Sequence, residues 1–240
     1  MSVSFARNSY GSGGGRELVD FIFMLTRSDE TIVDCLETWD AIERVSLGHA
    51  GFKDVGVDIA TLVELNKRMQ ASGVTTYLEV VSTSAEGCLQ SSRAAVEIGV
   101  DRLMGGTQVD ESLRILEGSG IEYLPFPGRP VGHPTQLGGD AELVERQCEE
   151  FEARGCAGVD LLAYRATDAA PLELVRAARR GTAGYLVVAG SVSTAAQIAE
   201  LRAAGADAFT IGSAVFDGSF SPNKGNIVSQ LRDVLDVTRG

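Results

Sequence analysis

Short apolar runs alternate with longer amphipathic segments along the chain from Val19 onward. Each apolar run is typical of a strand buried on both faces, and each segment between them has the spacing of a helix with one apolar face. The predicted strands cover residues 20–26, 51–57, 75–81, 101–104, 121–126, 159–164, 185–189 and 206–211. A repeated strand–helix unit predicts parallel strands joined by helices.

A recurring glycine supports this arrangement. Gly73, Gly99, Gly120, Gly158 and Gly205 each stand just before a predicted strand, followed by a small apolar residue and a polar one. Glycine ends a helix readily because it adopts the left-handed conformation. The pattern and the length of 240 residues predict an α/β fold, a closed (β/α)₈ barrel. An open doubly wound sheet is the alternative, but no GxGxxG turn or P-loop follows a strand.

Helix signals fit the same plan. A polar residue that can cap a helix, or a glycine that can end one, marks most of the predicted helices. The first three helices are predicted from Ser28 or Asp29 to about residue 45, over 59–71, and from Ser84 to Gly99. The next three are predicted from Asp140 to Gly155, from near Asp168 with Pro171 in the first turn, and from Ser193 or Thr194 to Gly205. Residues 1–15 end in a glycine-rich run and are expected to form a flexible extension, which leaves residues 16–240 as one barrel domain.

The charge and hydropathy of the chain limit the kinds of partner that it is expected to bind. The formal net charge is −12 and the pI is about 4.6, which argues against nucleic acid and anionic membranes as partners but not against a small anionic substrate. No apolar run approaches the length of a membrane span, and the N-terminus lacks a signal-peptide pattern, so a cytoplasmic protein is expected. Barrels of this size often dimerise, which leaves a homodimer open.

The metal-binding residue types are sparse. Cys35, Cys88, Cys148 and Cys156 show no CxxC spacing and are interpreted as reduced thiols. With only two histidines in the chain, no metal site and no cofactor are expected. Binding of a divalent metal by Glu79 and an aspartate is the alternative.

Two glycine–serine corners are the strongest functional signal. Gly190-Ser191 follows the seventh predicted strand and Gly212-Ser213 follows the eighth. In a (β/α)₈ barrel the loops after these strands often bind phosphate, because bare backbone N–H groups can approach the anion. The alternative is that the glycines only form tight strand-to-helix turns.

Ionisable residues fall at the ends of the other strands. Lys53 and Glu79 lie on neighbouring apolar strands, so they can meet if both point into the barrel. They form either a buried ion pair or an acid–base pair, and Lys53 could alternatively form an imine with a carbonyl substrate. Arg165 directly follows the sixth strand, where its guanidinium either binds a substrate carboxylate or phosphate or bridges to Asp168 in an exposed loop.

Further candidates follow the same strand ends. Arg27 and Asp29 follow the first strand, His133 lies in a Gly/Pro-rich loop after the fifth strand, and Asp168 follows Arg165. His133 is a candidate proton donor, and Asp168 is expected either in the site or as a helix cap. His49 and Trp39 are interpreted as structural.

The sequences 187–194 (VVAGSVST) and 209–216 (FTIGSAVF) resemble the phosphate-binding segments of the ribulose-phosphate-binding barrels, a group of TIM-barrel enzymes. The segment 161–169 (LLAYRATDA) is similar to the sixth strand of the keto-gulonate phosphate decarboxylases in that group, with Arg165 and Asp168 at matching positions. Tyr164 stands where those enzymes have a histidine. Lys53 resembles the second-strand lysine of the orotidine phosphate decarboxylases. The resemblance implies a phosphate site at Gly190, Ser191, Gly212 and Ser213.

These observations predict an enzyme of sugar-phosphate or sugar-acid-phosphate metabolism. An isomerase, epimerase or lyase would work through an enediolate, with Lys53 and Glu79 moving protons and Arg165 holding the substrate. One alternative is an aldolase that forms a Schiff base on Lys53. Another is a non-catalytic barrel that binds a phosphorylated metabolite.

Overall fold

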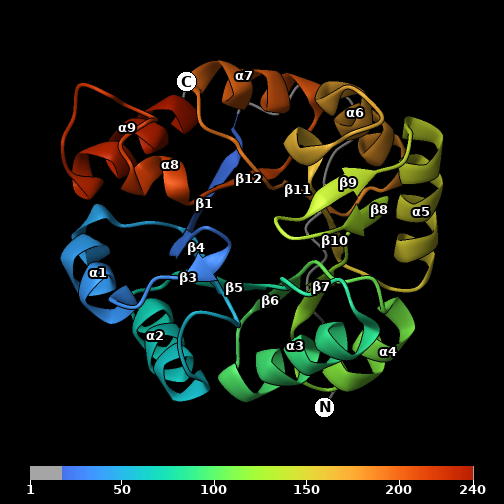
Figure 1. Cartoon of the computed structure of the whole chain (residues 1–240), viewed down its shortest axis with the longest axis horizontal. Coiled ribbons are helices and arrows are strands. Elements are labelled where there is room, and N and C mark those ends of the chain that lie inside the picture. Colours follow the sequence, from blue (N-terminus) through green and yellow to red (C-terminus); the bar gives the residue numbers. More distant parts are fainter. Residues whose placement is uncertain (1–17, 240) are drawn as a thin grey trace, which may run out of the picture.

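The barrel predicted from the sequence is present. The computed structural model describes residues 18–239, and the predicted extension 1–15 lies outside this range. Eight parallel strands run in the order β10-β11-β12-β1-β4-β5-β6-β7. Backbone N–H groups of Ala157 and Asp160 donate to the carbonyls of Tyr123 and Pro125, each at 3.0 Å, which joins β10 to β7 and closes the ring. The helices surround the strands (Figure 1).

The strands of the barrel are β1 (Asp20–Met24), β4 (His49–Lys53), β5 (Thr75–Glu79), β6 (Arg102–Met104), β7 (Glu122–Leu124), β10 (Gly158–Leu161), β11 (Tyr185–Val188) and β12 (Ala208–Ile211). The α-helices are α1 (Cys35–Ile42), α2 (Ile59–Ala71), α3 (Ala85–Ile98), α4 (Val109–Leu116), α5 (Ala141–Ala153), α6 (Pro171–Gly181), α7 (Ala195–Ala204), α8 (Ser213–Phe216) and α9 (Ile227–Arg239). Two short 3₁₀ turns are η1 (Glu43–Val45) and η2 (Ala163–Arg165). Two hairpins, β2 (Thr26–Arg27) with β3 (Glu30–Thr31) and β8 (Arg129–Val131) with β9 (Gln136–Gly138), complete the described elements.

Several predicted caps are confirmed. The side chains of Ser84, Asp140 and Thr194 accept hydrogen bonds from the first turns of α3, α5 and α7. Gly99 and Gly205 end α3 and α7 in the left-handed conformation, as the glycine pattern predicts. Trp39 is buried in α1, as predicted, and all four cysteines are buried and free.

The barrel interior is apolar in the middle and polar at both ends. Side chains that meet inside the barrel form one apolar cluster, which comprises Ile22, Met24, Tyr77, Met104, Leu124, Val187 and Ala208. At the N-terminal end of the strands, Arg102 donates to the Tyr77 hydroxyl at 2.8 Å and lies over the rings of Tyr77 and Tyr185. His49, predicted as structural, lies in this group with its Nδ1 3.0 Å from the Tyr77 hydroxyl. This network closes the end of the barrel opposite the candidate site.

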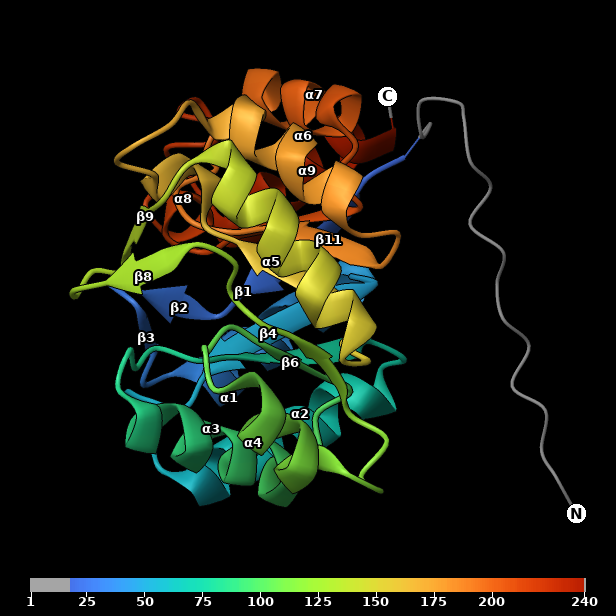
Figure 2. The ribbon, with the colours of Figure 1, turned by 90° about the vertical axis from the view of Figure 1, so that its right-hand side faces the viewer.

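Several predictions about local structure are wrong. The second strand ends at Lys53, whereas the apolar pattern placed it at 51–57. Ser28 and Asp29 do not cap a helix, because they form the turn between β2 and β3, and α1 begins only at Cys35. The Gly/Pro-rich segment after the fifth strand contains the hairpin of β8 and β9 rather than an irregular loop. Both hairpins project from the same end of the barrel (Figure 2).

Candidate active site

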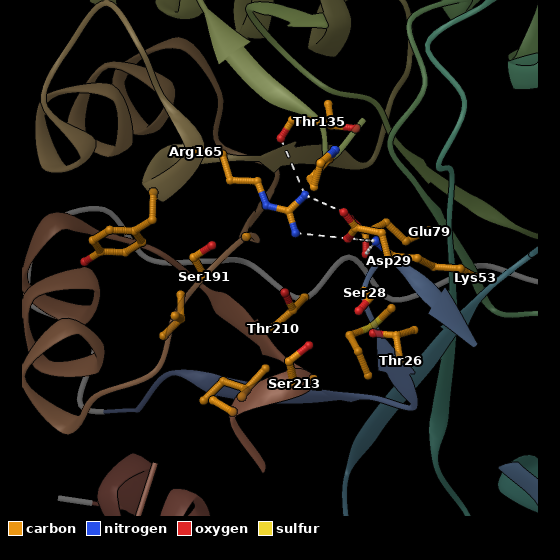
Figure 3. A pocket seen from close by; sticks show the side chains of 18 of the residues that line it. Thr26, Ser28, Asp29, Lys53, Glu79, Thr135, Arg165, Ser191, Thr210 and Ser213 are labelled. Atoms are coloured by element: carbon orange, nitrogen blue, oxygen red, sulfur yellow. Dashed lines mark hydrogen bonds and ion pairs between the residues drawn. The ribbon is translucent and has the colours of Figure 1, made fainter. Parts of the chain in front are cut away.

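A cavity of about 600 Å³ opens at the C-terminal ends of the barrel strands. This is the end of a (β/α)₈ barrel where active sites are built. Lys53, Glu79 and Arg165 line the cavity, and so do both glycine–serine corners. The ionisable and the glycine-rich halves of the predicted site are therefore brought together in one space (Figure 3).

Lys53 is the centre of a buried ionic group. It pairs with Glu79 in the β4–β5 register, and its Nζ lies 3.4 Å from Glu79 Oε2 and 2.7 Å from Asp29 Oδ1. The side chains of Lys53 and Glu79 are 7% and 9% exposed, which excludes most bulk water from the pair. Both side chains point into the barrel, as the acid–base interpretation requires.

Asp29 reaches this group from the β2–β3 hairpin. Its Oδ2 accepts from Arg165 Nη1 at 2.9 Å and its Oδ1 from Nη2 at 3.0 Å, a two-point contact between residues far apart in sequence. Arg165 therefore contacts Asp29 and does not form the bridge to Asp168 that was one of its two predicted roles. Asp29 joins the two cations of the site.

The charges of this group determine its protonation. Burial lowers the pKa of Lys53, but the charges of Glu79 and Asp29 and the hydrogen bond that Lys53 donates to Asp29 outweigh burial and raise the pKa above its ordinary value. Burial also opposes ionisation of Asp29, but Arg165 and Lys53 outweigh it and hold the pKa of Asp29 far below its usual range. Lys53 is an ammonium and Asp29 a carboxylate at neutral pH.

Arg165 links the ionic group to the first glycine corner. Gly190 has a positive φ of 82°, and a Cβ at this position would lie 2.9 Å from both Cγ and Nε of Arg165. The arginine side chain thus lies against the bare backbone of Gly190, and its positive charge adjoins the predicted phosphate site. Ser191 continues the corner with φ 66°, a left-handed conformation that is uncommon outside glycine.

The second glycine–serine corner, Gly212-Ser213, also packs closely against a neighbouring strand. A Cβ at Gly212 would lie 2.8 Å from Thr26 Oγ1 and 2.9 Å from the Thr26 carbonyl, so only glycine fits beside the start of β2. Ser213 begins the short helix α8, and both residues line the cavity. Helices leave their first N–H groups without intrahelical partners, so backbone donors are available at this corner.

Asp160 is a site residue that the sequence reasoning missed. It lies on β10 with 0% exposure, and neither carboxyl oxygen has a hydrogen-bond partner among the described residues. Burial raises the pKa of Asp160 well above the ordinary value, and the negative charge of Glu79 adds to this rise, while Lys53 and Arg165 oppose it. The available signal was a single acidic residue inside the apolar run 159–164.

Three of the weaker candidates lie outside the cavity lining. Arg27 is exposed, donates to the Phe216 carbonyl at 3.4 Å and lies over the Phe216 ring. Asp168 is exposed and accepts from the N–H of Gly139 at 2.8 Å, so it anchors the β8–β9 hairpin and does not cap α6. His133 is exposed in the turn of that hairpin, whereas its neighbours Pro134 and Thr135 line the cavity.

Within residues 18–239, no three histidine, cysteine, aspartate or glutamate side chains are grouped so that they could hold a metal ion. No helix in the same range has the length and apolar character needed to cross a bilayer.

Comparison with solved structures identifies the fold of the chain. The tryptophan synthase α-subunit from Pyrococcus furiosus superposes with a TM-score of 0.62 over 92% of this chain and 97% of that chain, at 13% identity. The chain is a TIM barrel. The YdjI aldolase from Escherichia coli gives a TM-score of 0.59 at 15% identity, covering 93% of this chain and 88% of that one. A chain of the BexX/CysO complex from Amycolatopsis orientalis gives a TM-score of 0.59 at 17% identity, and the match covers 95% of this chain and 91% of that one. No family model and no curated protein sequence matches the chain.

Proposed function

We propose that this TIM barrel is an enzyme that moves protons on a small phosphorylated sugar or sugar acid through an enediolate, as an isomerase, epimerase or lyase. The observation that carries the proposal is that Lys53, Glu79 and both glycine–serine corners line one cavity. One end of that cavity offers backbone donors to an anion, and the other offers a buried acid and base.

The two halves have complementary roles. The phosphate of the substrate binds at Gly190, Ser191, Gly212 and Ser213, with the charge of Arg165 beside Gly190. This assignment also rests on the resemblance of 187–194 and 209–216 to the ribulose-phosphate-binding barrels. The Glu79 carboxylate removes a proton from the carbon next to the substrate carbonyl, and that bond's electron pair moves to form the enediolate. The Lys53 ammonium donates to the carbonyl oxygen, where negative charge develops.

The lining of the cavity indicates a polyhydroxylated substrate. Hydroxyl groups are frequent in it and come from both hairpins and several strand ends; they belong to Thr26, Ser28, Thr135, Thr167, Ser191, Thr210 and Ser213. Met24, Val192 and Ile211 are the larger aliphatic residues among the lining. Hydroxyl groups that line a pocket discriminate strongly for substrates that can hydrogen-bond to them.

Imine formation is disfavoured by the contacts of Lys53. A Schiff base requires a neutral amine, and the Lys53 ammonium is paired with both Asp29 and Glu79. The proposal therefore gives Lys53 the role of proton donor.

The test is proton exchange with solvent. The protein is incubated in D₂O with a panel of short ketose, aldose and sugar-acid phosphates, and deuterium at the carbon next to the carbonyl is followed by NMR. Lys53→Met and Glu79→Gln are each expected to lower the exchange rate by about 100-fold or more, because each removes a proton-transferring group.

Glu30→Gln is the matched control, because it removes a carboxylate on the exposed face of the β2–β3 hairpin. It should exchange at the wild-type rate. Exchange that persists in both Lys53→Met and Glu79→Gln would contradict the proposed function, as would a panel on which the wild type gives no exchange at all.

A further inference from the structure

The β2–β3 hairpin is built against one residue of the barrel. Thr31 Oγ1 donates to the Lys53 carbonyl at 2.7 Å and accepts from the Lys53 N–H at 2.9 Å. The Thr31 N–H donates to the Val55 carbonyl at 2.9 Å, which extends the contact along the segment after β4. The hairpin therefore binds the backbone of Lys53 through Thr31, and its turn places Asp29 next to the Lys53 side chain.

The turn that carries Asp29 has an uncommon backbone conformation. Ser28 and Asp29 have φ values of 50° and 63°, so both central residues of a two-residue hairpin turn are left-handed. Turns of this geometry favour Asn-Gly, because side chains other than those of glycine, asparagine and aspartate fit this conformation poorly. Such strain persists where the surrounding contacts maintain it. Here the contacts are the two-point bond to Arg165 and the bond to Lys53.

We propose that Asp29 is a positioning residue that holds Lys53 as a fixed ammonium, so that the site transfers protons and is prevented from forming an imine. This inference rests on the proposed function, in which Lys53 acts as an acid. Asp29 is the closer of the two carboxylates to Lys53, at 2.7 Å against 3.4 Å for Glu79, and it alone makes a hydrogen bond to Nζ among the described contacts. Arg165 in turn fixes the Asp29 carboxylate from the opposite side.

The other charged groups around Lys53 do not replace Asp29. Glu79 on β5 must accept a proton during the proposed reaction, and it is then neutral. Asp160 on β10 is fully buried, and neither of its carboxyl oxygens has a hydrogen-bond partner among the described residues, so no hydrogen bond from Asp160 holds the ammonium in place. Arg165 is itself a cation. Asp29 is the group that keeps its charge throughout the reaction.

The experiment measures the reactivity of the Lys53 amine directly. Glycolaldehyde and cyanoborohydride are added at neutral pH: the neutral amine attacks the aldehyde carbon, water leaves, and hydride from cyanoborohydride reduces the imine to a secondary amine. Peptide mass spectrometry then gives the labelling rate at Lys53, with Lys67 and Lys224 as internal references. Glycolaldehyde carries no phosphate, so the result is independent of the phosphate site and of any turnover.

The wild type should label Lys53 much more slowly than the two reference lysines. Asp29→Asn keeps the size of the side chain and its fitness for the turn, and it should raise the Lys53 rate by about 10-fold or more, because loss of an adjacent opposite charge lowers a lysine pKa by at least about one unit. Glu30→Gln on the same hairpin should leave the rate at the wild-type value.

A second variant separates this role from a loss of folding. Glu79→Gln removes the other carboxylate without altering the turn, and it should raise the Lys53 rate by less than Asp29→Asn. Wild-type labelling at Lys53 as fast as at Lys67, or an Asp29→Asn rate equal to that of Glu30→Gln in a protein with an unchanged circular dichroism spectrum, would overturn the proposal. Absence of proton exchange together with the predicted labelling pattern would count against the proposed function and leave the role of Asp29 intact.

Discussion

Four buried or half-buried side chains give the barrel mouth a nearly balanced charge. The cations Lys53 and Arg165 share Asp29, and Lys53 also faces Glu79. Lys53 and Glu79 could be found from the sequence because charged residues inside apolar strands require a partner or a function. The same reasoning applied to Asp160, but a strand buried on both faces has no alternation to show which side chains point into the barrel.

Replacement of Asp160 should change how stability depends on pH. Complete burial, together with the negative charge of Glu79, raises the pKa of the folded Asp160 carboxyl above its unfolded value. It therefore adds stability below the ordinary pKa of aspartate, about 3.9, and this contribution is lost as pH rises toward the folded pKa. Asp160→Asn should match the wild type near pH 4 and become more stable by about 1.4 kcal/mol per pH unit above it, up to the folded pKa.

The measurement is urea unfolding of both proteins from pH 4 to 8. Glu97→Gln, which replaces an exposed carboxylate on α3, is the control and should follow the pH dependence of the wild type. A difference between Asp160→Asn and the wild type that stays constant with pH would show that Asp160 is ionised in the folded protein.

At the level of elements, the hairpins that cover the barrel mouth were harder to predict than the barrel. Ser28 and Asp29 have the composition of a helix N-cap, and only the contacts of Asp29 with Lys53 and Arg165 select a turn with positive φ at both residues. The segment of β8 and β9 is rich in glycine and proline, which is typical of loops, yet its Thr135 carbonyl accepts from Arg165 at 3.5 Å and its Gly139 N–H is held by Asp168. Long-range contacts decided both structures, and local sequence carries little information about them.

The strain in the β2–β3 turn gives a prediction for Ser28. Asparagine is favoured at the first central position of such a turn, where φ is 50° here. Ser28→Asn should therefore raise the free energy of unfolding by about 0.5 kcal/mol while leaving Asp29 in place. Urea unfolding measures the change, and slow labelling of Lys53 should be retained. Destabilisation by this substitution would indicate that the turn is not held in the left-handed conformation.

In the whole molecule, the two ends of the barrel differ: one is closed by packed polar side chains, and the other carries the candidate site. The end closed by Tyr77, Arg102 and Tyr185 has polar side chains that contact one another. The open end has turns with positive φ, close glycine contacts and Asp160, whose carboxyl finds no hydrogen-bond partner among residues 18–239. The closed barrel was predictable because the strand–helix repeat, the glycine stops and the helix caps all indicate the same fold. The site was predictable to the level of strand ends, since the barrel fold fixes where those ends meet.

A crystal structure of the protein with phosphoglycolate tests the central claim most directly, because this ligand carries a phosphate and, two atoms away, a planar carboxylate that resembles an enediolate. The account predicts the phosphate within hydrogen-bond distance, about 2.7–3.2 Å, of backbone N–H groups at both the Gly190-Ser191 and Gly212-Ser213 corners. It also predicts a ligand carboxylate oxygen within the same distance of Lys53 Nζ. A phosphate bound elsewhere, or a ligand whose carboxylate points away from Lys53 and Glu79, would contradict it.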